Sequence, residues 1–278
     1  MKMAASQPAP SPEPLSRMLL SIDSDPCPFG CTYCFAQFDQ YVPPTSLDEL
    51  EANPERCTSV DILYPACDSD LFARSDFDSI LERVAKFGKS VSVSTKAQIG
   101  NRAVSALQEL RSALASSSAV IKVGISISTK YSVSSIEPRT PGYDARLRSL
   151  ARLRQEDIPS ALILRPLLSD VSDAEYEEIL TDCSELTNRV LVGDEWLDQG
   201  NRFREARSLA GSSVISQAVV NWLPTKPEWS RRSSPGRVDK IRSVAERLGL
   251  ALFESDVELM HDVLNRGRKG VDRCRQPM

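Results

Sequence analysis

Residues 27–35 read Cys27-Pro-Phe-Gly-Cys31-Thr-Tyr-Cys34-Phe35, and they lie shortly after the apolar run 17–22 (RMLLSI). The three cysteines are separated by three and then two residues, so one short loop carries three thiols. Closely spaced cysteine thiolates are the usual ligands of iron–sulfur clusters. Three ligands for four irons leave one iron open for chemistry. The stretch therefore predicts a cluster-binding loop at the C-terminal end of a first strand.

A structural zinc site is the alternative interpretation of this loop. Zinc sites favour a second pair of Cys or His ligands, often spaced as C-x2-C. The single histidine of the chain, His261, is far away in the sequence, whereas Cys57 or Cys67 could complete a zinc site. The spacing of the three clustered cysteines favours the iron–sulfur cluster.

Length and composition predict one large α/β domain. The chain has 278 residues, and 41% of them are apolar, which is enough for a sizeable core. It has no run of about 18 apolar residues, so no membrane span is expected. The N-terminus lacks the apolar core of a signal peptide, which predicts a cytoplasmic protein.

Charge and cysteine content exclude several functional classes. The seven cysteines, three of them clustered, indicate metal and redox work in a reducing compartment rather than a disulfide framework. A formal net charge of −4 argues against a strongly basic nucleic-acid clamp. The single histidine leaves little room for a Ser-His-Asp triad.

Six apolar runs of strand length alternate with stretches that carry apolar residues at helical spacing. The expected strands are residues 17–22, 60–64, 91–94, 120–127, 161–165 and 189–192. The expected helices between them are residues 46–51, 77–87, 101–114, 144–155 and a helix that begins at 172 or 173. Strands separated by helices predict parallel β-α-β units with right-handed crossovers. Six such units predict a partial (β/α)6 barrel that is open on one side.

The chain divides into four expected parts. Residues 1–16 are rich in Pro and Ser and predict a disordered leader. Residues 17–193 form the barrel core, 194–265 an α/β extension packed on the core, and 266–278 a basic, flexible tail. Within the extension we expect helices at 238–248 and 257–264, a short strand at 251–253 and a loop over 226–237.

Further motifs stand where the expected strands end, and ligands of parallel α/β proteins collect at that end. They are Tyr64-Pro-Ala-Cys67-Asp-Ser-Asp70, Ser94-Thr-Lys96, Gly124-Ile-Ser126-Ile-Ser128, Ile136-Glu-Pro138-Arg-Thr140 and Leu164-Arg-Pro166. With the cysteine loop, the order of these motifs resembles the radical S-adenosylmethionine (SAM) enzymes. Within that superfamily they resemble the spore photoproduct lyase-like, or DNA-repair-photolyase-like, branch. The resemblance covers residues 17–185.

The resemblance implies a 4Fe-4S cluster on Cys27, Cys31 and Cys34 whose open iron chelates SAM. It implies that one electron, from a donor such as flavodoxin or ferredoxin, cleaves SAM to a 5′-deoxyadenosyl radical. That radical abstracts hydrogen from the substrate in a lyase-like reaction.

The resemblance also implies the parts that single side chains play. Lys96 is expected to pair with the SAM carboxylate, because an ammonium forms a charge-assisted hydrogen bond with an anion. Ser126 is expected to face the ribose or methionyl part of SAM, and Arg165 to hold a carboxylate or the ribose. Phe35 is assigned to the cofactor site as well.

Two residues are expected to be catalytic, namely Cys67 and Tyr33. By resemblance, the Cys67 thiol returns hydrogen to the product radical. The lyases carry a second tyrosine directly after the third cluster cysteine, and this chain has Phe35 there, which has no O–H group. Whether SAM is recycled or consumed is therefore left open.

Three functions are compatible with these patterns. The first is a radical SAM enzyme acting on a nucleic-acid lesion, a nucleotide or a nucleoside, for which Trp222, Trp229 and the basic segments 231–242 and 266–275 could bind bases and phosphates. The second is a radical SAM enzyme that modifies a small molecule or a peptide. The third is a non-enzymatic iron–sulfur or zinc protein used as a scaffold or sensor. The sequence sets neither the oligomeric state nor the hydrogen that is attacked.

Overall fold

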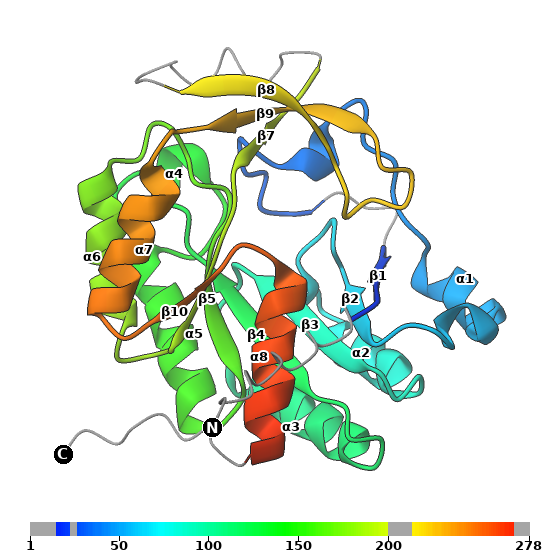
Figure 1. The fold of residues 1–278 in the computed structure, drawn as a ribbon. Coiled ribbons are helices and arrows are strands. Elements are labelled where there is room, and N and C mark those ends of the chain that lie inside the picture. The colour runs from blue at the N-terminus through cyan, green and yellow to red at the C-terminus, as the bar shows by residue number, and fades with distance from the viewer. Residues whose placement is uncertain (1–14, 23–26, 200–212, 270–278) are drawn as a thin grey trace, which may run out of the picture.

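The computed structural model describes residues 15–22, 27–199 and 213–269, so most of the expected leader and the end of the expected tail lie outside the described residues. A 7-stranded parallel sheet forms the body of the protein (Figure 1). Its strands are β1 Arg17–Leu20, β2 Ile62–Pro65, β3 Ser90–Thr95, β4 Ile121–Ser126, β5 Ser160–Leu164, β6 Arg189–Val192 and β10 Ala251–Phe253. Their order across the sheet is β1-β2-β3-β4-β5-β6-β10.

Helices follow the strands in the order that the sequence predicts. They are α1 Leu47–Ala52, α2 Phe77–Ala85, α3 Asn101–Ala115, α4 Val133–Ile136, α5 Tyr143–Gln155, α6 Asp173–Cys183, α7 Arg237–Arg247 and α8 Asp256–Lys269. Short 3-10 turns lie at Phe35–Gln37, Pro54–Cys57 and Leu71–Ala73. Local signals set several of these ends; α1, for example, begins with a capping box in which Ser46 and Glu49 each bind the backbone of the other.

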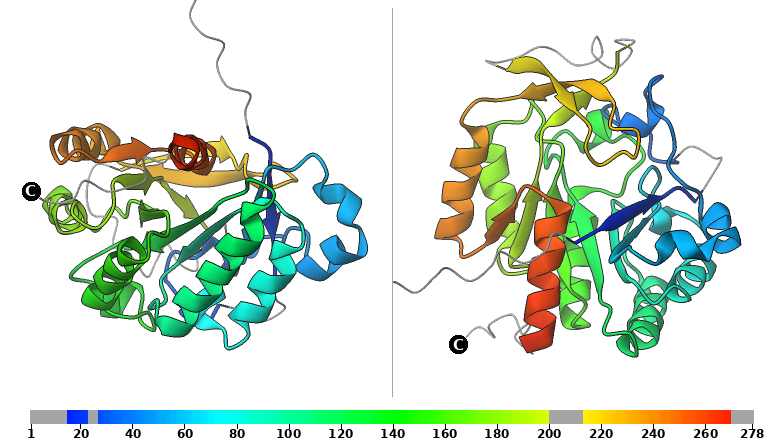
Figure 2. Two further views of the ribbon diagram at one scale, coloured as in Figure 1. Left: turned by 90° about the horizontal axis from the view of Figure 1, so that it is seen from below. Right: turned by 45° about the vertical axis from the view of Figure 1, so that its right-hand side comes forward.

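The sheet curves but does not close, because β1 and β10 are its two edges. Figure 2 shows helices α2, α3 and α5 on the outer face of the curved sheet. This arrangement confirms the predicted α/β fold with parallel strands and an open side. The short strand expected at 251–253 is β10. The prediction did not place it in the parallel sheet, where it pairs with β6 through the Ala251–Arg189 and Phe253–Leu191 registers.

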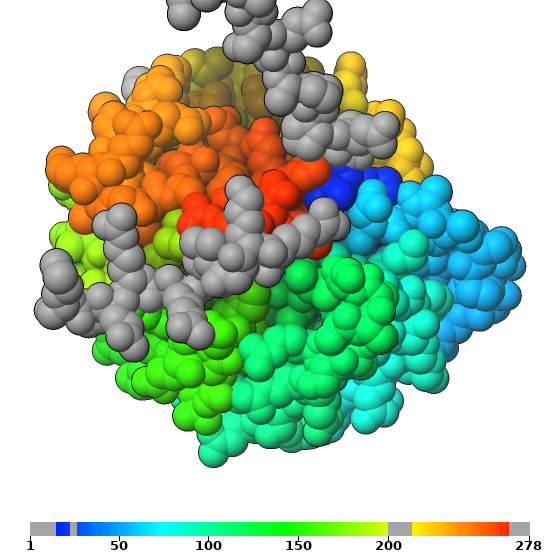
Figure 3. Space-filling view, turned by 60° about the horizontal axis from the view of Figure 1, so that its bottom comes forward, coloured from blue at the N-terminus to red at the C-terminus, as the bar shows by residue number. Residues whose placement is uncertain are grey.

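Helix α8 covers the concave face of the sheet. Its Leu259 packs against side chains of β5 and β6, and its Met260 packs against Ile62 and Tyr64 of β2. The helix therefore fills the space between the two halves of the open barrel, and in Figure 3 it (red) lies beside the N-terminal strand (blue). It extends to Lys269, past the boundary expected at residue 265.

A second, antiparallel sheet lies above the C-terminal ends of the parallel strands (Figure 1). Its order is β7 Glu195–Leu197, β9 Glu228–Ser233 and β8 Val214–Val219. The prediction of a loop over 226–237 was wrong, because β9 occupies its middle. Burial of Trp229 and a buried ion pair between Arg232 and Glu195, at 3.3 Å, stabilise this polar strand.

No helix among the described residues is long and apolar enough to cross a membrane.

Candidate active site

A cavity of about 260 Å³ lies at the C-terminal ends of the parallel strands, below the second sheet. Its walls come from the ends of β1 to β6, from the cysteine loop and from the second sheet. Every residue that the sequence assigned to the site lines this cavity: Cys27, Cys31, Tyr33, Cys34, Phe35, Cys67, Lys96, Ser126 and Arg165. Strand ends far apart in the sequence thus converge where the fold predicts a ligand site.

The cysteine loop is compact and fastened to the end of α4. The Thr32 N–H donates to the Ile136 carbonyl at 3.0 Å, and the Cys34 N–H donates to the Cys31 carbonyl at 3.2 Å. Gly30 has a φ of 60°, where a Cβ would also meet the Arg139 guanidinium at 2.3 Å. A glycine at this position therefore allows the turn that brings the three thiols together.

The three cysteine thiols of the loop all line the cavity. All three cysteines are free. Within the described part of the chain, no three Cys, His, Asp or Glu side chains converge closely enough to hold one metal ion.

Burial controls the protonation of these thiols. It raises the pKa of Cys31 to about 12 and also raises the pKa of Cys27 and of Cys34. Thiols in such surroundings are neutral at pH 7 until a metal binds them, because metal binding releases the proton. The site is therefore an apolar pocket of thiols, which are ligands for Cu(I), Zn and Fe–S clusters alike.

Lys96 stands at the end of β3, and Asp70 fixes the backbone there. One Asp70 oxygen accepts from Thr95 Oγ1 at 2.6 Å, and the other accepts from the Lys96 N–H at 2.7 Å. The Lys96 ammonium lies 5.5 Å from the centroid of the Tyr33 ring. Burial lowers the pKa of Lys96, but nearby negative groups, including Glu137, outweigh it and raise that pKa above its usual value. Lys96 is therefore a cation, and Asp70, in the loop between β2 and α2, fixes its backbone.

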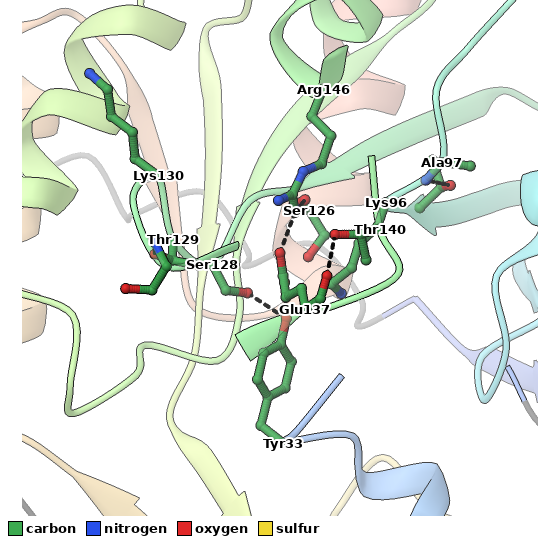
Figure 4. Close-up of polar contacts among 12 residues, drawn as sticks. Tyr33, Lys96, Ala97, Ser126, Ser128, Thr129, Lys130, Glu137, Thr140 and Arg146 are labelled. Atoms are coloured by element: carbon green, nitrogen blue, oxygen red, sulfur yellow. Dashed lines mark hydrogen bonds and ion pairs between the residues drawn. The ribbon is translucent and has the colours of Figure 1, made fainter. Parts of the chain in front are cut away.

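Tyr33 is held by a buried network below the cysteine loop (Figure 4). Its hydroxyl donates to Glu137 Oε1 and lies 2.8 Å from Ser128 Oγ. The other Glu137 oxygen accepts from Arg146 Nη1 at 2.6 Å, and Arg146 Nη1 also donates to the Ser126 carbonyl at 3.0 Å. Glu137 and Arg146 are both fully buried. This network gives Tyr33 a positioning role in the loop, while its part in radical chemistry stays a prediction.

The sequence analysis quoted Glu137 within the motif 136–140 but gave neither Glu137 nor Arg146 a part in the site. A Glu-Pro pair between β4 and α5 is typical of a turn, and arginines on a helix are usually exposed. Neither residue gives a local signal of burial.

Ser126 lies on β4 beside this network. Its side chain is 4% exposed, and its hydroxyl has no hydrogen-bond partner among the described residues. A buried polar group without a partner is costly, so its oxygen is available to a ligand in the cavity.

Cys67 lies in a tight turn at the end of β2. Ala66 has a φ of 58°, a left-handed conformation that is uncommon for a residue with a side chain and that gathers at functional sites. The Cys67 N–H donates to the Leu20 carbonyl at 3.3 Å, which fastens the turn to β1. Burial raises the pKa of the Cys67 thiol, so the group keeps its S–H bond at neutral pH.

Arg165 closes the opposite side of the cavity. Its Nη1 donates to Asp256 Oδ2 at 2.8 Å, which joins β5 to the first turn of α8. The side chain passes over Gly193, where a Cβ would lie 2.5 Å from Arg165 Nε. The sequence predicted a ligand-binding arginine here and did not predict its carboxylate partner.

Aromatic rings from the second sheet and the cysteine loop form the upper wall. The Phe35 ring centroid lies 4.8 Å from that of Trp222 and 5.4 Å from that of Tyr41, in edge-to-face arrangements. Trp196 also lines the cavity. Trp222 was noted in the sequence as a candidate for base stacking, whereas Trp196, on β7, was missed because only the second sheet brings it here.

The fold is similar to that of solved structures of spore photoproduct lyase and of SuiB. One point mutant of spore photoproduct lyase superposes with a TM-score of 0.61 at 12% identity, over 91% of this chain and 81% of that one. A spore photoproduct lyase mutant with bound AdoMet and dinucleoside spore photoproduct gives a TM-score of 0.59 at 12% identity, over 85% of this chain and 82% of that one.

The fold also resembles SuiB from Streptococcus suis. The SuiB structure bound to its precursor peptide SuiA has a TM-score of 0.57 at 12% identity, and the match covers 90% of this chain but 51% of SuiB. No family model matches the chain. No curated protein matches it either. At this level of identity the likeness establishes the fold, and the activity has to be argued from the site.

Proposed function

We propose that this protein is a radical SAM enzyme that uses a 4Fe-4S cluster to cleave SAM reductively and to remove hydrogen from a substrate. One observation carries this proposal. The three free thiols of the cysteine loop, the Lys96 ammonium and the Cys67 thiol line one cavity at the C-terminal end of an open parallel sheet. The fold shared with SAM-binding structures of spore photoproduct lyase and SuiB supports it.

The residues of the cavity fit both cofactors. Cys27, Cys31 and Cys34 would hold the cluster, as soft thiolate ligands do. Lys96 would hold the SAM carboxylate, because its ammonium has no hydrogen-bond acceptor among the described residues. The unpartnered Ser126 hydroxyl would bind the ribose or methionyl part. When bound, the cluster and SAM supply a 5′-deoxyadenosyl radical from one electron of a flavodoxin- or ferredoxin-type donor.

The protein's own residues orient the groups that bind the ligand and enclose the cavity. The Asp70 contacts fix Lys96, and the Glu137 network fixes Tyr33 within the loop, so the binding groups are positioned before the ligand arrives. The second sheet covers the cavity and limits the access of water, which protects a reactive intermediate. The Cys67 thiol, at the cavity wall, would donate a hydrogen atom.

We propose a nucleobase-containing substrate: a nucleic-acid lesion, a nucleotide or a nucleoside. The aromatic wall formed by Phe35, Trp196 and Trp222 supports this, since planar bases stack on such rings. Arg17 at the cavity wall adds positive charge for a phosphate.

One observation favours the alternative, a small molecule or a peptide. The basic segment 231–242 could have bound a nucleic-acid backbone, but its side chains contact carboxylates within the chain. The pairs are Arg231–Asp194, Arg232–Glu195, Arg237–Asp173, Lys240–Asp173 and Arg242–Glu254. A surface neutralised in this way contributes little to phosphate binding.

Reductive cleavage of SAM tests the proposed class. The protein is reconstituted anaerobically with iron and sulfide, and then incubated with dithionite and SAM. We expect 5′-deoxyadenosine to form, and we expect none from Cys31→Ala. Cys57→Ala is the matched control, because Cys57 is a buried cysteine outside the cavity. A protein that binds iron but releases no 5′-deoxyadenosine would be a scaffold or sensor instead.

Gel-shift titrations at several salt concentrations separate the substrate classes. A nucleic-acid substrate predicts binding of DNA or RNA that weakens as salt rises, because phosphate contacts release counterions. Absence of binding at low salt would leave a nucleotide, a nucleoside or the alternative substrates, which a mass-spectrometric screen following 5′-deoxyadenosine release can sort.

A further inference from the structure

A row of polar side chains crosses the concave face of the parallel sheet. Its members are Tyr64 on β2, Ser92 on β3 and Lys122 on β4, three strands that are neighbours in the sheet (Figure 1). The register pairs Ser92 directly with Lys122, and the β2–β3 register continues the row to Tyr64. Met260 of α8, the helix that covers the concave face, packs against Tyr64. The three polar groups therefore lie side by side between the sheet and α8.

All three polar groups are buried without a partner. The Tyr64 hydroxyl, the Ser92 hydroxyl and the Lys122 ammonium form no hydrogen bond within the described part of the chain. Lys122 is 0% exposed, Ser92 1% and Tyr64 8%. One buried polar group without a partner is costly, and a buried ammonium without one is more so. Each of the three can donate a hydrogen bond, so the row lacks an acceptor.

The row opens into the cavity. Tyr64 and Ser92 line the cavity, together with Arg17 of β1. Ser92 lies in the middle of β3, so this part of the cavity is deeper in the barrel than the strand ends. We call Arg17, Tyr64, Ser92 and Lys122 the floor of the cavity.

The two cations of the floor have no carboxylate in contact with them. Asp256 is the nearby carboxylate, and it is already bound by Arg165 at 2.8 Å. Lys122 has no hydrogen-bond partner among the described residues, and Arg17 forms no ion pair with any of them. The floor therefore carries positive charge that no side chain in contact with it neutralises.

The other carboxylates of the cavity wall are engaged elsewhere. Asp68 accepts from Ser21 Oγ at 2.7 Å, and Asp194 lies 3.6 Å from Arg231. Asp70 accepts two hydrogen bonds at the end of β3. The acceptor that the floor lacks must therefore come from a bound ligand.

We propose that the floor is an anion-binding subsite that holds one phosphate or carboxylate group of the substrate. This inference rests on the proposed function and narrows its substrate. One oxyanion can accept hydrogen bonds from two cations and two hydroxyls, which gives every open donor of the floor a partner. The aromatic wall of the same cavity is left for the planar part of the substrate.

The depth of the floor limits the kind of molecule that can reach it. Ser92 precedes Lys96, the residue after the end of β3, by four positions, and α8 covers the concave face on the other side. A group that reaches the floor therefore enters as the free end of a small molecule. The phosphates inside a nucleic-acid strand are linked on both sides and have no such end. The floor favours a mononucleotide over a nucleic-acid strand and, among the alternative substrates, a molecule with a free carboxylate.

Anion binding is tested in the protein without cluster or SAM, by calorimetric titration with inorganic phosphate and, separately, with acetate. We expect one of these ions to bind, and the tighter one shows which group the substrate carries. Lys122→Met and Arg17→Met should each weaken that binding by about 10-fold or more, and Ser92→Ala by about 5-fold. Lys86→Met is the matched control, because Lys86 lies outside the cavity wall, and it should leave the affinity unchanged.

Lys122→Met keeps the length of the side chain and removes a buried charge without a partner, so this variant should fold, which thermal unfolding verifies. Absence of binding by both ions would overturn the inference, as would equal affinity in Lys122→Met and the unaltered protein. Binding that is lost in Lys96→Met but kept in Lys122→Met would place the anion at the SAM site and overturn it as well.

A pair of nucleosides tests the link to the substrate. Uridine 5′-monophosphate should bind about 10-fold or more tightly than uridine if the group is a phosphate, and Lys122→Met should remove the difference. Equal affinity of the two in a protein that prefers phosphate to acetate would overturn the inference.

The outcomes separate this inference from the proposed function, because anion binding needs neither the cluster nor SAM. Release of 5′-deoxyadenosine by a protein that binds no anion would overturn the inference alone. Anion binding at the floor by a protein that releases no 5′-deoxyadenosine would support the subsite and overturn the proposed function.

Discussion

Replacing Glu137 by alanine should destabilise the whole protein and loosen the cysteine loop. Glu137 and Arg146 are fully buried and joined at 2.6 Å, and the remaining Glu137 oxygen accepts from Tyr33. In the variant, the Arg146 guanidinium keeps only its bond to the Ser126 carbonyl, because its Nε and Nη2 atoms have no partner among the described residues. The substitution therefore leaves a charge that is buried and almost unpaired.

The expected loss follows from that charge. Removing one partner of a buried ion pair costs about 3–5 kcal/mol in the free energy of unfolding. Single domains are stable by about 5–15 kcal/mol, so the variant should remain folded but lose a large share of its stability. Urea titration followed by circular dichroism measures the difference. Iron content after reconstitution should fall as well, because Tyr33 lies between two cluster cysteines and loses its anchor.

An exposed ion pair provides the matched control. Glu178 binds Lys130 at 3.0 Å, but its side chain is 46% exposed, so Glu178→Ala should change stability by about 1 kcal/mol or less. A loss below about 1 kcal/mol for Glu137→Ala would refute the reasoning, since it would place this pair in the same class as exposed ones.

Three further predictions concern the cavity. Lys96→Met should weaken SAM binding by about 10-fold or more in calorimetric titration of the reconstituted protein, because a charge-assisted hydrogen bond is worth about 1.5–3 kcal/mol. Gly193→Ala should lower the free energy of unfolding by about 1–3 kcal/mol, because the new Cβ displaces Arg165 from Asp256. Lys122 is buried without a hydrogen-bond partner, and burial lowers its pKa to about 8, so the native protein loses this proton at lower pH than the unfolded chain does. Because the unfolded chain then binds more protons, stability should rise by about 3 kcal/mol as the pH increases from about 8 to about 10.5, and Lys122→Met should abolish that rise.

Each of these predictions has a control and a contrary result. Lys86→Met changes a lysine outside the cavity, and equal SAM affinity in the Lys86 and Lys96 variants would remove Lys96 from the SAM site. Gly142→Ala meets nothing within 4 Å, so it should be tolerated, and Gly193→Ala should not. The charges that act on Lys122 are Asp256, Arg165 and Arg189. A pH profile that is the same with and without Lys122 would mean that other groups set the pH dependence.

Local patterns were sufficient to predict the parallel strands, their helices and the residues at the strand ends. Short apolar runs that alternate with helical segments predict a parallel sheet. In such a sheet the C-terminal ends of the strands lie at one edge. Cys67, Lys96, Ser126 and Arg165, which stand at expected strand ends and were assigned to the site by resemblance, all line one cavity.

Features that depend on contacts between distant segments were not predictable. Arg231 and Arg232 gave segment 226–237 the composition of a loop, yet burial of Arg232 beside Glu195 makes it the central strand of the second sheet. The sequence did not predict that Glu137 binds Tyr33 or that Asp256 binds Arg165. Only the folded chain brings each carboxylate to its partner.

The central claim is that Cys27, Cys31 and Cys34 hold a four-iron cluster with one iron open to SAM. Electron paramagnetic resonance of the reconstituted, dithionite-reduced protein, recorded before and after SAM is added, tests it most directly. We predict the signal of a reduced 4Fe-4S cluster, a change of that signal on addition of SAM, and loss of the cluster in Cys31→Ala. A protein that binds zinc in place of the cluster, or a cluster whose signal is indifferent to SAM, would contradict the account.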